Sequence, residues 1–294
     1  MYKRVLVPLD GSSAGEEIIP YALALSGGLS ADVQLLRVFS LAPLAGHYAV
    51  AGMDWEKVEE AMRGETDAYL EEVRSGLGAE TTSVTAITAE GLTANSIIAE
   101  AASQPDTLVA MTTHARGGVV RGIIGSVTDD VLRNGDSPML VLRSRDDDED
   151  RPVPALDTMV VALDGSPLAE EVLPHAVAVA KALDLKIDLL TVLPGNDPAF
   201  SDGSQPSPAH DKSLAYLQST KEWVQGQGIT RVGQVVLHGQ PAAAIIDLVD
   251  NLPGAIVAMT THGWSGAERW LLGSVAERVV RHAQRPVLLV RAQD

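Results

Sequence analysis

The sequence predicts an α/β fold with two tandem, doubly wound domains of the Rossmann-like kind, each built on a five-stranded parallel sheet. Three observations support this prediction. The chain of 294 residues contains an internal repeat, short apolar runs alternate with helical patterns in each copy, and those apolar runs are continuous. Continuous apolar runs are typical of strands that helices cover on both faces. In such folds a ligand binds beyond the carboxyl ends of the strands.

The repeat is visible in two places. Val5–Ser12 returns as Met159–Ser166 at an offset of 154 residues, and Met111–Asn134 returns as Met259–His282 at an offset of 148. The middle of the second copy is therefore six residues shorter. An acidic run followed by prolines separates the copies, and such a composition favours a solvated linker. We predict a first domain at residues 1–145, a linker at 146–154 and a second domain at 155–294.

Each copy begins with a strand and a helix. The first strand is predicted at Arg4–Leu9, where β-branched and apolar residues cluster. A helix follows, and Ser13 with Glu16 fits a capping box at its start. In the second copy Ser166 is a suitable N-cap, with proline at the first helical position.

The middle of each copy contains a second strand, a long helix and a third strand. The predicted ranges are the strands Asp32–Val38 and Lys186–Leu193, the helices Trp55–Ser75 and Ala209–Gln227, and the strands Thr82–Thr88 and Arg231–Leu237. Each copy then ends with a helix, a strand, a glycine loop, a further helix and a strand that follows a proline. These are predicted as the helices Ala94–Ser103 and Pro241–Asn251, the strand Ala255–Met259, helices beginning at Ser126 and Ser274, and the last strands Pro138–Arg143 and Pro286–Arg291.

The stretch Met259–His282 predicts an anion-binding site, and its first copy, Met111–Asn134, repeats the pattern. A strand runs into a loop bracketed by Gly263 and Gly273, and a helix begins directly afterwards. The N–H groups of the first helical turn and the positive end of the helix dipole point at one spot. Glycine also lets a ligand approach the backbone closely.

The serine at each helix start has two compatible roles. Ser274 with Glu277, and Ser126 with Asp129, fit capping boxes, which would satisfy the first amides of each helix. A capped helix start is also a place where phosphates bind. We therefore expect each serine to cap its helix without ligand and to donate to a phosphate with it.

Other polar candidates have two interpretations each. Asp10 and Asp164 either accept hydrogen bonds from a sugar or base, or cap an Asx turn in Asp-Gly-Ser. His262 has no metal-ligand partner at useful spacing, so it is either structural or bonded to a phosphate. Arg269 is either a phosphate contact or an exposed surface side chain.

Composition excludes several classes of protein. A net charge of −17 disfavours nonspecific binding to nucleic acid and to anionic membranes. The sequence has no cysteine, which excludes disulfides and thiolate sites. The chain starts directly with a strand pattern and has no apolar run near the roughly 20 residues that span a bilayer. We therefore expect a cytoplasmic protein.

These residues resemble the universal stress protein family in its tandem form, over nearly the whole chain. The resemblance rests on the Val-x-Leu-Asp-Gly-Ser start, most of a G-x-x-G-x₉-G-[ST]-V pattern, and the last strand ending in arginine. One subgroup of this family binds ATP there, usually with a divalent metal such as Mg²⁺ or Mn²⁺ held by the phosphates. Another subgroup lacks the glycines and binds no nucleotide.

Carried over by position, the resemblance implies an adenine nucleotide site in each repeat. In the second repeat it comprises Asp164, Val192, Gly263, Gly273, Ser274 and Val275. In the first it comprises Asp10, Val38, Gly125, Ser126 and Val127. The pattern is broken by Thr260 in the second repeat and by Thr112 and Ala115 in the first. We therefore expect the second repeat to be the better ATP site.

The favoured function is a non-catalytic, ATP-binding stress-response protein whose nucleotide stabilises or switches an assembly. The alternatives are a scaffold that binds no nucleotide and a slow, metal-dependent ATPase. No nucleophile elbow, Walker lysine or paired-carboxylate motif is found in the sequence. The resemblance further implies that the last strands of the two repeats pair antiparallel within the chain, and that two chains associate as a homodimer.

Overall fold

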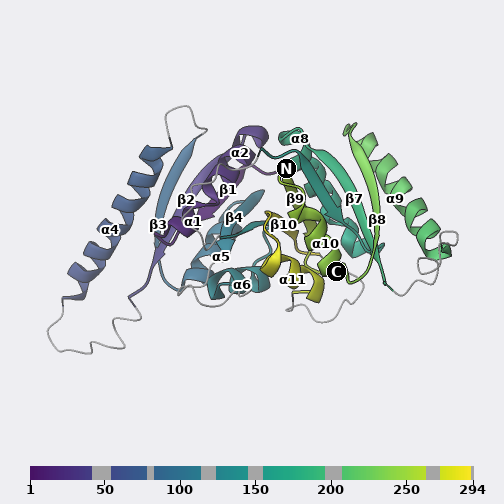
Figure 1. Cartoon of the computed structure of the whole chain (residues 1–294). Coiled ribbons are helices and arrows are strands. Elements are labelled where there is room, and N and C mark those ends of the chain that lie inside the picture. The colour runs from purple at the N-terminus through teal and green to yellow at the C-terminus, as the bar shows by residue number, and fades with distance from the viewer. Residues whose placement is uncertain are drawn as a thin grey trace.

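The computed structural model describes residues 1–41, 54–77, 83–113, 124–144, 155–195, 207–262 and 272–292. Within these residues ten strands form a single sheet in the order β3-β2-β1-β4-β5-β10-β9-β6-β7-β8, with helices on both faces (Figure 1). Neighbouring strands within each repeat are parallel. The doubly wound prediction is thus confirmed. The predicted linker, residues 146–154, lies outside the described residues.

The elements begin and end within about two residues of the predicted positions. The strands are β1 (Arg4–Pro8), β2 (Asp32–Phe39), β3 (Val84–Glu90), β4 (Thr107–Thr113), β5 (Met139–Arg143), β6 (Thr158–Ala162), β7 (Lys186–Leu193), β8 (Val232–His238), β9 (Ala255–Thr260) and β10 (Val287–Val290). The helices of the first repeat are α1 (Ser13–Glu16), α2 (Ile19–Leu29), α4 (Trp55–Gly76), α5 (Thr93–Ser103) and α6 (Ser126–Asn134). Those of the second are α7 (Pro167–Glu170), α8 (Val172–Ala182), α9 (Pro208–Gly226), α10 (Pro241–Asp250) and α11 (Ser274–His282).

The first predicted helix of each repeat is divided in two, because a proline follows the first turn. Pro20 lies near the start of α2 and Pro174 near the start of α8. A proline has no N–H to donate to the carbonyl four residues earlier, and its ring crowds that carbonyl. The short helices α1 and α7 therefore end just before α2 and α8 begin.

The capping-box prediction for Ser13 is wrong, and Ser12 is the N-cap of α1. The Ser12 hydroxyl accepts the N–H of Gly15 at 3.0 Å. Asp10 receives both the N–H and the hydroxyl of Ser12, at 3.0 and 2.6 Å, which holds Ser12 in the extended conformation that an N-cap adopts. In the second repeat Ser166 caps α7 as predicted, accepting the N–H of Ala169 at 3.1 Å.

Alternate residues of each strand enter two separate cores. Val5 and Val7 belong to the core beneath α2, α4, α8 and α9, whereas Leu6 belongs to the core beneath α5, α6, α10 and α11. All three side chains are fully buried. Both cores contain residues from the two repeats. Apolar burial, the main favourable term in folding, is therefore continuous across the domain boundary.

The two repeats join through their last strands, which confirms the predicted antiparallel pairing. Leu140 of β5 lies opposite Leu288 of β10, and Val141 lies opposite Val287. Leu140 and Leu288 are equivalent positions in the repeat, so a pseudo-twofold axis passes between them. The pairing covers two strand edges that would otherwise be open.

The helices α2 and α8 meet on one side of this axis (Figure 1). Gly28 of α2 faces its own repeat equivalent, Ala182 of α8, so closely that a Cβ on Gly28 would overlap the Ala182 carbonyl. Nearby, the Tyr2 hydroxyl bonds to Nδ1 of His175 at 2.6 Å. Burial raises the pKa of Tyr2 and lowers the pKa of His175. Both contacts link the first repeat to the second.

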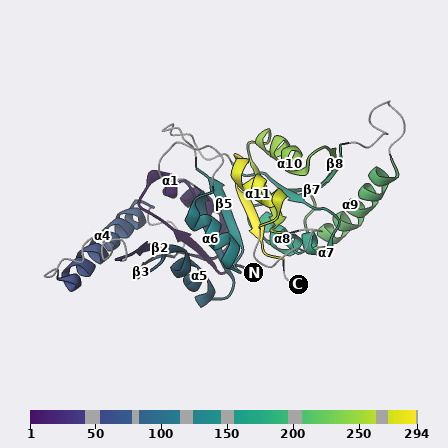
Figure 2. The same ribbon diagram turned by 90° about the horizontal axis from the view of Figure 1, so that it is seen from below.

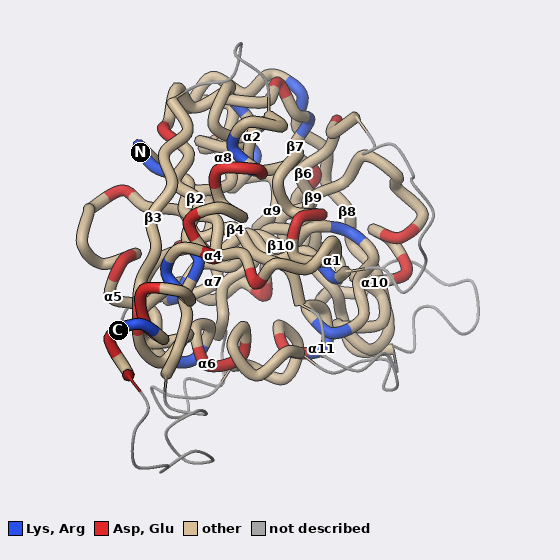
Figure 3. Tube along the Cα trace, turned by 90° about the vertical axis from the view of Figure 1, so that its left-hand side faces the viewer, with Lys and Arg blue, Asp and Glu red and all other residues tan. Residues whose placement is uncertain are grey.

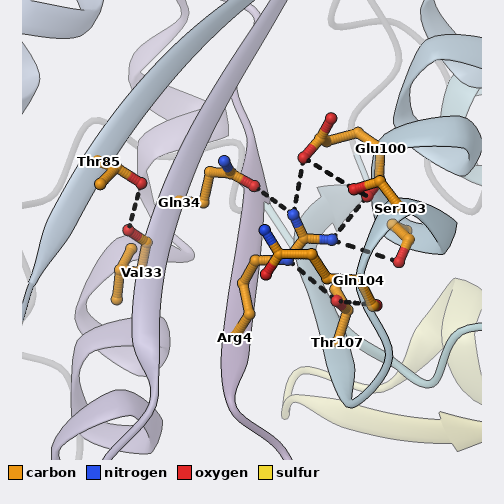
Figure 4. Close-up of polar contacts among 9 residues, drawn as sticks. Arg4, Val33, Gln34, Thr85, Glu100, Ser103, Gln104 and Thr107 are labelled. Carbon is orange, nitrogen blue, oxygen red and sulfur yellow. Dashed lines mark hydrogen bonds and ion pairs between the residues drawn. The ribbon is translucent and has the colours of Figure 1, made fainter.

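The amino-terminal edge of the first repeat is held by a buried arginine (Figure 4). Arg4, at the start of β1, donates to Thr107 at 3.0 Å, to Gln34 at 2.6 Å and to the Glu100 carboxylate at 2.7 Å. It also donates to the Glu100 carbonyl at 2.6 Å. Its side chain is 4% exposed, so these bonds replace the water that a guanidinium would otherwise need. This cluster lies at the sheet edge opposite the carboxyl ends of the strands.

Adding one methyl group at Gly28 should separate α2 from α8. We expect Gly28→Ala to lower the free energy of unfolding by about 1–3 kcal/mol, the usual range for overpacking. Gly27→Ala is the matched control in the same helix, because a Cβ there meets nothing within 4 Å. That control should be neutral or stabilise by up to about 1 kcal/mol through helix propensity. Urea denaturation of both variants measures the difference, and equal stabilities would contradict the close contact.

Stability should fall on acidification because of His175. Burial lowers its pKa below the ordinary value of 6.5, so the folded protein binds this proton more weakly than the unfolded chain does. The contribution is fully present above pH 6.5 and is lost as the pH falls below that value. Thermal melts between pH 8 and 5 should show a smaller pH dependence in His175→Gln than in the parent. A pH dependence as steep in His175→Gln as in the parent would refute the assignment.

Candidate functional site

A cavity lies at the carboxyl edge of the strands in each repeat. The first has a volume of about 580 Å³ and the second about 310 Å³. Each is bounded by the ends of the first two strands of its repeat, by the end of β4 or β9, and by the start of α6 or α11. This is the edge at which a doubly wound sheet places its ligand.

The aspartate at each cavity completes a turn. Asp164 accepts the N–H and the hydroxyl of Ser166 on the same oxygen, Oδ1, at 2.9 and 2.6 Å. Asp10 does the same for Ser12. The Asx-turn interpretation is therefore confirmed. Both carboxylates also line their cavities, so a contact with a ligand stays a prediction.

The helices α6 and α11 begin differently from the prediction. Gly125 and Gly273 are the N-caps, Ser126 and Ser274 are the first helical residues, and no side chain caps either helix within the described residues. The capping-box prediction for both serines is therefore wrong. The reason is that each helix begins one residue earlier, at a glycine with no side chain to cap it. Glu277 instead pairs with Arg281 at 2.5 Å, and Asp129 with Arg133 at 2.8 Å.

This start leaves amide donors on the cavity wall. The Glu277 N–H bonds to the Gly273 carbonyl at 2.9 Å and is the first amide within α11 to do so. The amides of Ser274, Val275 and Ala276 precede it, and amides in the first turn have no acceptor within a helix. All three residues line the second cavity. Ser274 and Ser126 are exposed, so their hydroxyls are accessible from the cavity side.

Gly273 is required by the protein itself. Its N–H bonds to the Thr261 carbonyl at 2.8 Å, and a Cβ at Gly273 would also lie 2.8 Å from that oxygen. Its φ of −58° is ordinary for any residue, so the need is for space. The glycine thus has a role in the protein's own packing, and its role in the close approach of a ligand stays a prediction. The glycine fixes the helix start against the strand that enters the loop.

Thr260 occupies the position where the family pattern has its first glycine. Its hydroxyl donates to the His262 carbonyl at 2.6 Å, and the side chain is almost fully buried. Nδ1 of His262 lies 3.1 Å from the Thr261 hydroxyl. Thr260 is therefore part of the chain's own hydrogen bonding at the end of β9. In the first repeat Thr112 lies at the same place, and its carbonyl accepts the Thr128 hydroxyl at 3.0 Å.

The structure brings together every predicted site residue that it describes. Those lining the second cavity are Asp164, Val192, Thr260, His262, Gly273, Ser274 and Val275. Those lining the first are Asp10, Val38, Thr112, Gly125, Ser126 and Val127. The remaining three, Gly263, Arg269 and Ala115, lie outside the described residues.

Apolar side chains from α5 and α10, and from the strands β4 and β9, were missed by sequence reasoning. Ile97 and Met111 form part of the first cavity, and Ile245 and Met259 form part of the second. They look like ordinary core residues in the sequence, and only their position on a cavity wall sets them apart. Each site thus combines amide and hydroxyl donors, an aspartate after the first strand of its repeat and an apolar wall. That set suits a ligand with an anionic end, hydroxyl groups and a flat apolar part.

The first cavity also extends toward α4, where the second cavity has no counterpart. Arg37 and Glu65 line it, whereas Thr191 replaces Arg37 in the second repeat and bonds to the Leu163 carbonyl at 3.1 Å. The Arg37 guanidinium lies 4.5 Å from the centre of the Tyr69 ring, a cation–π distance. Burial, and then the hydrogen bond to Glu16 at 2.8 Å, raises the pKa of Tyr69.

In the described part of the chain, no group of three or more His, Asp or Glu side chains is placed to hold a metal ion. Across the same residues, every helix is too short or too polar to cross a membrane.

Comparison with known proteins identifies relatives along both repeats. The universal stress protein family matches residues 1–143 and 156–291. A universal stress protein of Mycobacterium tuberculosis is 29% identical over 194 residues, which cover 63% of this chain and 61% of that protein. One of Methanocaldococcus jannaschii is 27% identical over 143 residues, covering 49% of this chain and 83% of its own. The mycobacterial relative is therefore matched over about three fifths of its length.

A solved structure resembles the whole chain. The crystal structure of a universal stress protein from Archaeoglobus fulgidus covers 99% of this chain and 99% of its own, with a TM-score of 0.69 and 20% identity. At 20% identity this likeness shows a similar fold and carries no conclusion about function. It extends over both repeats and so includes their arrangement about the shared sheet.

Replacing Gly273 should affect stability before any ligand is added. We expect Gly273→Ala to lower the free energy of unfolding by about 1–3 kcal/mol, because the new methyl group must displace the Thr261 carbonyl. Gly64→Ala in α4 is the control, since a Cβ there meets nothing within 4 Å. Urea denaturation in ligand-free buffer measures both. Unchanged stability of Gly273→Ala would mean that the glycine is kept for a ligand after all.

Proposed function

Since the chain belongs to the universal stress protein family, we propose that it is a cytoplasmic ATP-binding protein without catalytic activity. ATP binds in the cavities at the carboxyl edge of the sheet, and its binding stabilises the assembly of the two repeats. The observation that carries this proposal is the start of α11 and α6 on the cavity walls, where no side chain of the described residues caps the helix.

The residues present fit an adenine nucleotide. The amides of Ser274 and Val275 and the Ser274 hydroxyl would hold phosphate oxygens at the positive end of α11. Asp164 would accept from ribose or from the base amino group, and Ile245 offers an apolar contact for the base. ATP would add its triphosphate charge, with Mg²⁺ or Mn²⁺ held by the phosphates. Binding through amides explains how a protein of net charge −17 takes up an anion.

The surface charge supports the exclusion of nucleic acid as a partner. Figure 3 shows acidic residues on the helices, and the exposed face of α4 carries Glu56, Glu60 and Glu72. Such a surface repels a phosphate backbone at long range. A single nucleotide enters a cavity lined by amides and is less affected by this repulsion.

The second repeat is proposed as the tighter of the two sites. Its sequence retains Gly263, where the first repeat has Ala115. An alanine that must adopt a positive φ costs roughly 1–3 kcal/mol. The cavity of the first repeat is larger and is lined by Arg37, and it is the other candidate site for ATP.

The absence of catalysis is proposed from the roles that polar groups already have. Oδ1 of Asp164 accepts two hydrogen bonds in its turn, so this oxygen is not presented to a reacting water. The Thr260 hydroxyl is engaged by the His262 carbonyl. A steady release of phosphate from ATP that depended on Asp164 would contradict this part of the proposal.

A negative charge at the helix start tests the nucleotide site. We expect Ser274→Asp to weaken ATP binding at the second site by tenfold or more, about 1.4 kcal/mol, because the carboxylate repels phosphate. Ser126→Asp should do the same at the first site. Both serines are exposed first-turn residues, where an acidic side chain favours the helix, so the fold should not suffer. Calorimetry with MgATP on the parent, both variants and the double variant gives each affinity.

Two controls separate charge from other effects. Ser219→Asp adds the same charge on the exposed face of α9, away from both cavities, and should leave affinity unchanged. Ser274→Ala removes the hydroxyl alone and should weaken binding by a few fold. No heat of binding from the parent protein would overturn the proposal and favour a nucleotide-free scaffold. Loss of all binding in Ser126→Asp alone would reverse the ranking of the repeats.

A further inference from the structure

The arginine after β10 reaches across the domain boundary. Arg291 belongs to the second repeat, yet its Nη1 donates to the carbonyl oxygens of Arg133 at 3.3 Å and Gly135 at 2.9 Å in the first. It also pairs with the Asp136 carboxylate at 3.2 Å. The Arg291 side chain is 22% exposed, so its cation is largely covered by this contact.

The arginine at the end of β5 makes the equivalent contact in the opposite direction. Nη1 of Arg143 lies 3.5 Å from the carbonyl oxygen of His282, the last residue of α11. Arg143 and Arg291 are equivalent positions in the repeat, and the pseudo-twofold axis between β5 and β10 relates the two contacts. Figure 2 shows α6 and α11 on either side of this strand pair. Each arginine thus lies at the carboxyl end of the other domain's helix.

The helices so contacted are the two whose amino-terminal ends line the cavities. α6 has nine residues and is about 13 Å long, so its two ends are close enough to be positioned together. Its last carbonyls have no partner within the helix, and a cation there also complements the helix dipole. Arg291 supplies both the hydrogen bonds and the charge. The internal pair between Arg133 and Asp129 does not connect α6 to the other domain.

We propose that Arg291 is a positioning residue for the nucleotide site of the first repeat. The second domain holds the carboxyl end of α6, and this fixes where the amides at its amino end face the first cavity. The first site is therefore complete only while the domains are docked. This inference rests on the function proposed above.

The two sites depend on the domain contact to different degrees. Arg291 makes two carbonyl contacts and one ion pair, whereas the Arg143 contact is single and long. The first site should therefore be the more sensitive. Because coupling is reciprocal, nucleotide in the first cavity should in turn strengthen the docking of the two domains. That provides a physical route by which ATP could act on the assembly.

The test replaces Arg291 by glutamine in a protein whose second site is disabled by Ser274→Asp. Hydrogen exchange of α6 and α11 without ligand reports the positioning directly. We expect faster exchange in α6, at the far side of the boundary from the substitution, with α11 little changed. Calorimetry with MgATP should show first-site affinity reduced about five- to tenfold. Arg291→Lys keeps the charge but not the planar guanidinium, and should recover part of the loss.

The control is Arg231→Gln, another arginine of the second repeat. Arg231 donates to the Asp184 carbonyl and pairs with its carboxylate at 2.9 Å, all within its own domain. It should leave α6 exchange and first-site affinity unchanged. Unchanged α6 exchange in Arg291→Gln, or equal acceleration of α6 and α11, would overturn the proposal. Faster α6 exchange in a protein that binds no ATP would support the positioning and reject the nucleotide.

Discussion

The antiparallel pairing of β5 with β10 is the contact on which the rest of the structure depends. It turns two sheets into one and places Leu140 opposite its own equivalent, Leu288. Without it each repeat would present an open strand edge to solvent or to another chain. The same pairing aligns α2 with α8 on one face and brings the last arginines to α11 and α6 on the other. A covalent tandem thus acquires the symmetry of a dimer.

The site is built from backbone more than from side chains. Gly273 is the N-cap of α11, and its N–H bonds to the Thr261 carbonyl. In the described residues no side chain caps the helix, so the next amides have no side-chain acceptor there. The side chains around it largely serve the chain itself, as Thr260 does toward His262 and Asp164 toward Ser166. A backbone site has no charge of its own to neutralise. It is therefore compatible with an acidic protein and tolerant of changes in the residues nearby.

The differences between the repeats lie at the sheet edges. At the amino-terminal edge Arg4 forms a buried cluster, while Thr158 occupies the equivalent position in the second repeat. At the carboxyl edge Arg37 lies over Tyr69, while Thr191 bonds to the backbone. Such changes leave the strands and their order intact, because each is satisfied by local partners. The two repeats have thus kept one fold while their cavities differ in size and in polar lining.

The sequence alone determined the repeat, the strands and helices, and the polar and glycine residues that meet at each cavity. It could do so because periodicity and the Asp-Gly-Ser and glycine-loop patterns are local signals. Its errors were also local. The sequence predicts Ser13 and Ser274 as capping residues, whereas the N-caps in the structure are Ser12 and Gly273. Spacing alone cannot distinguish a cap from its neighbour, because the hydrogen bonds to Asp10 and to the Thr261 carbonyl decide where the helix begins. Tertiary structure alone decided the apolar wall of Ile97 and Ile245, the close contact of Gly28 with Ala182, and the reach of Arg291 to α6. Those contacts join residues that are far apart in the chain. Spacing within the sequence does not predict that such residues lie close together in the fold.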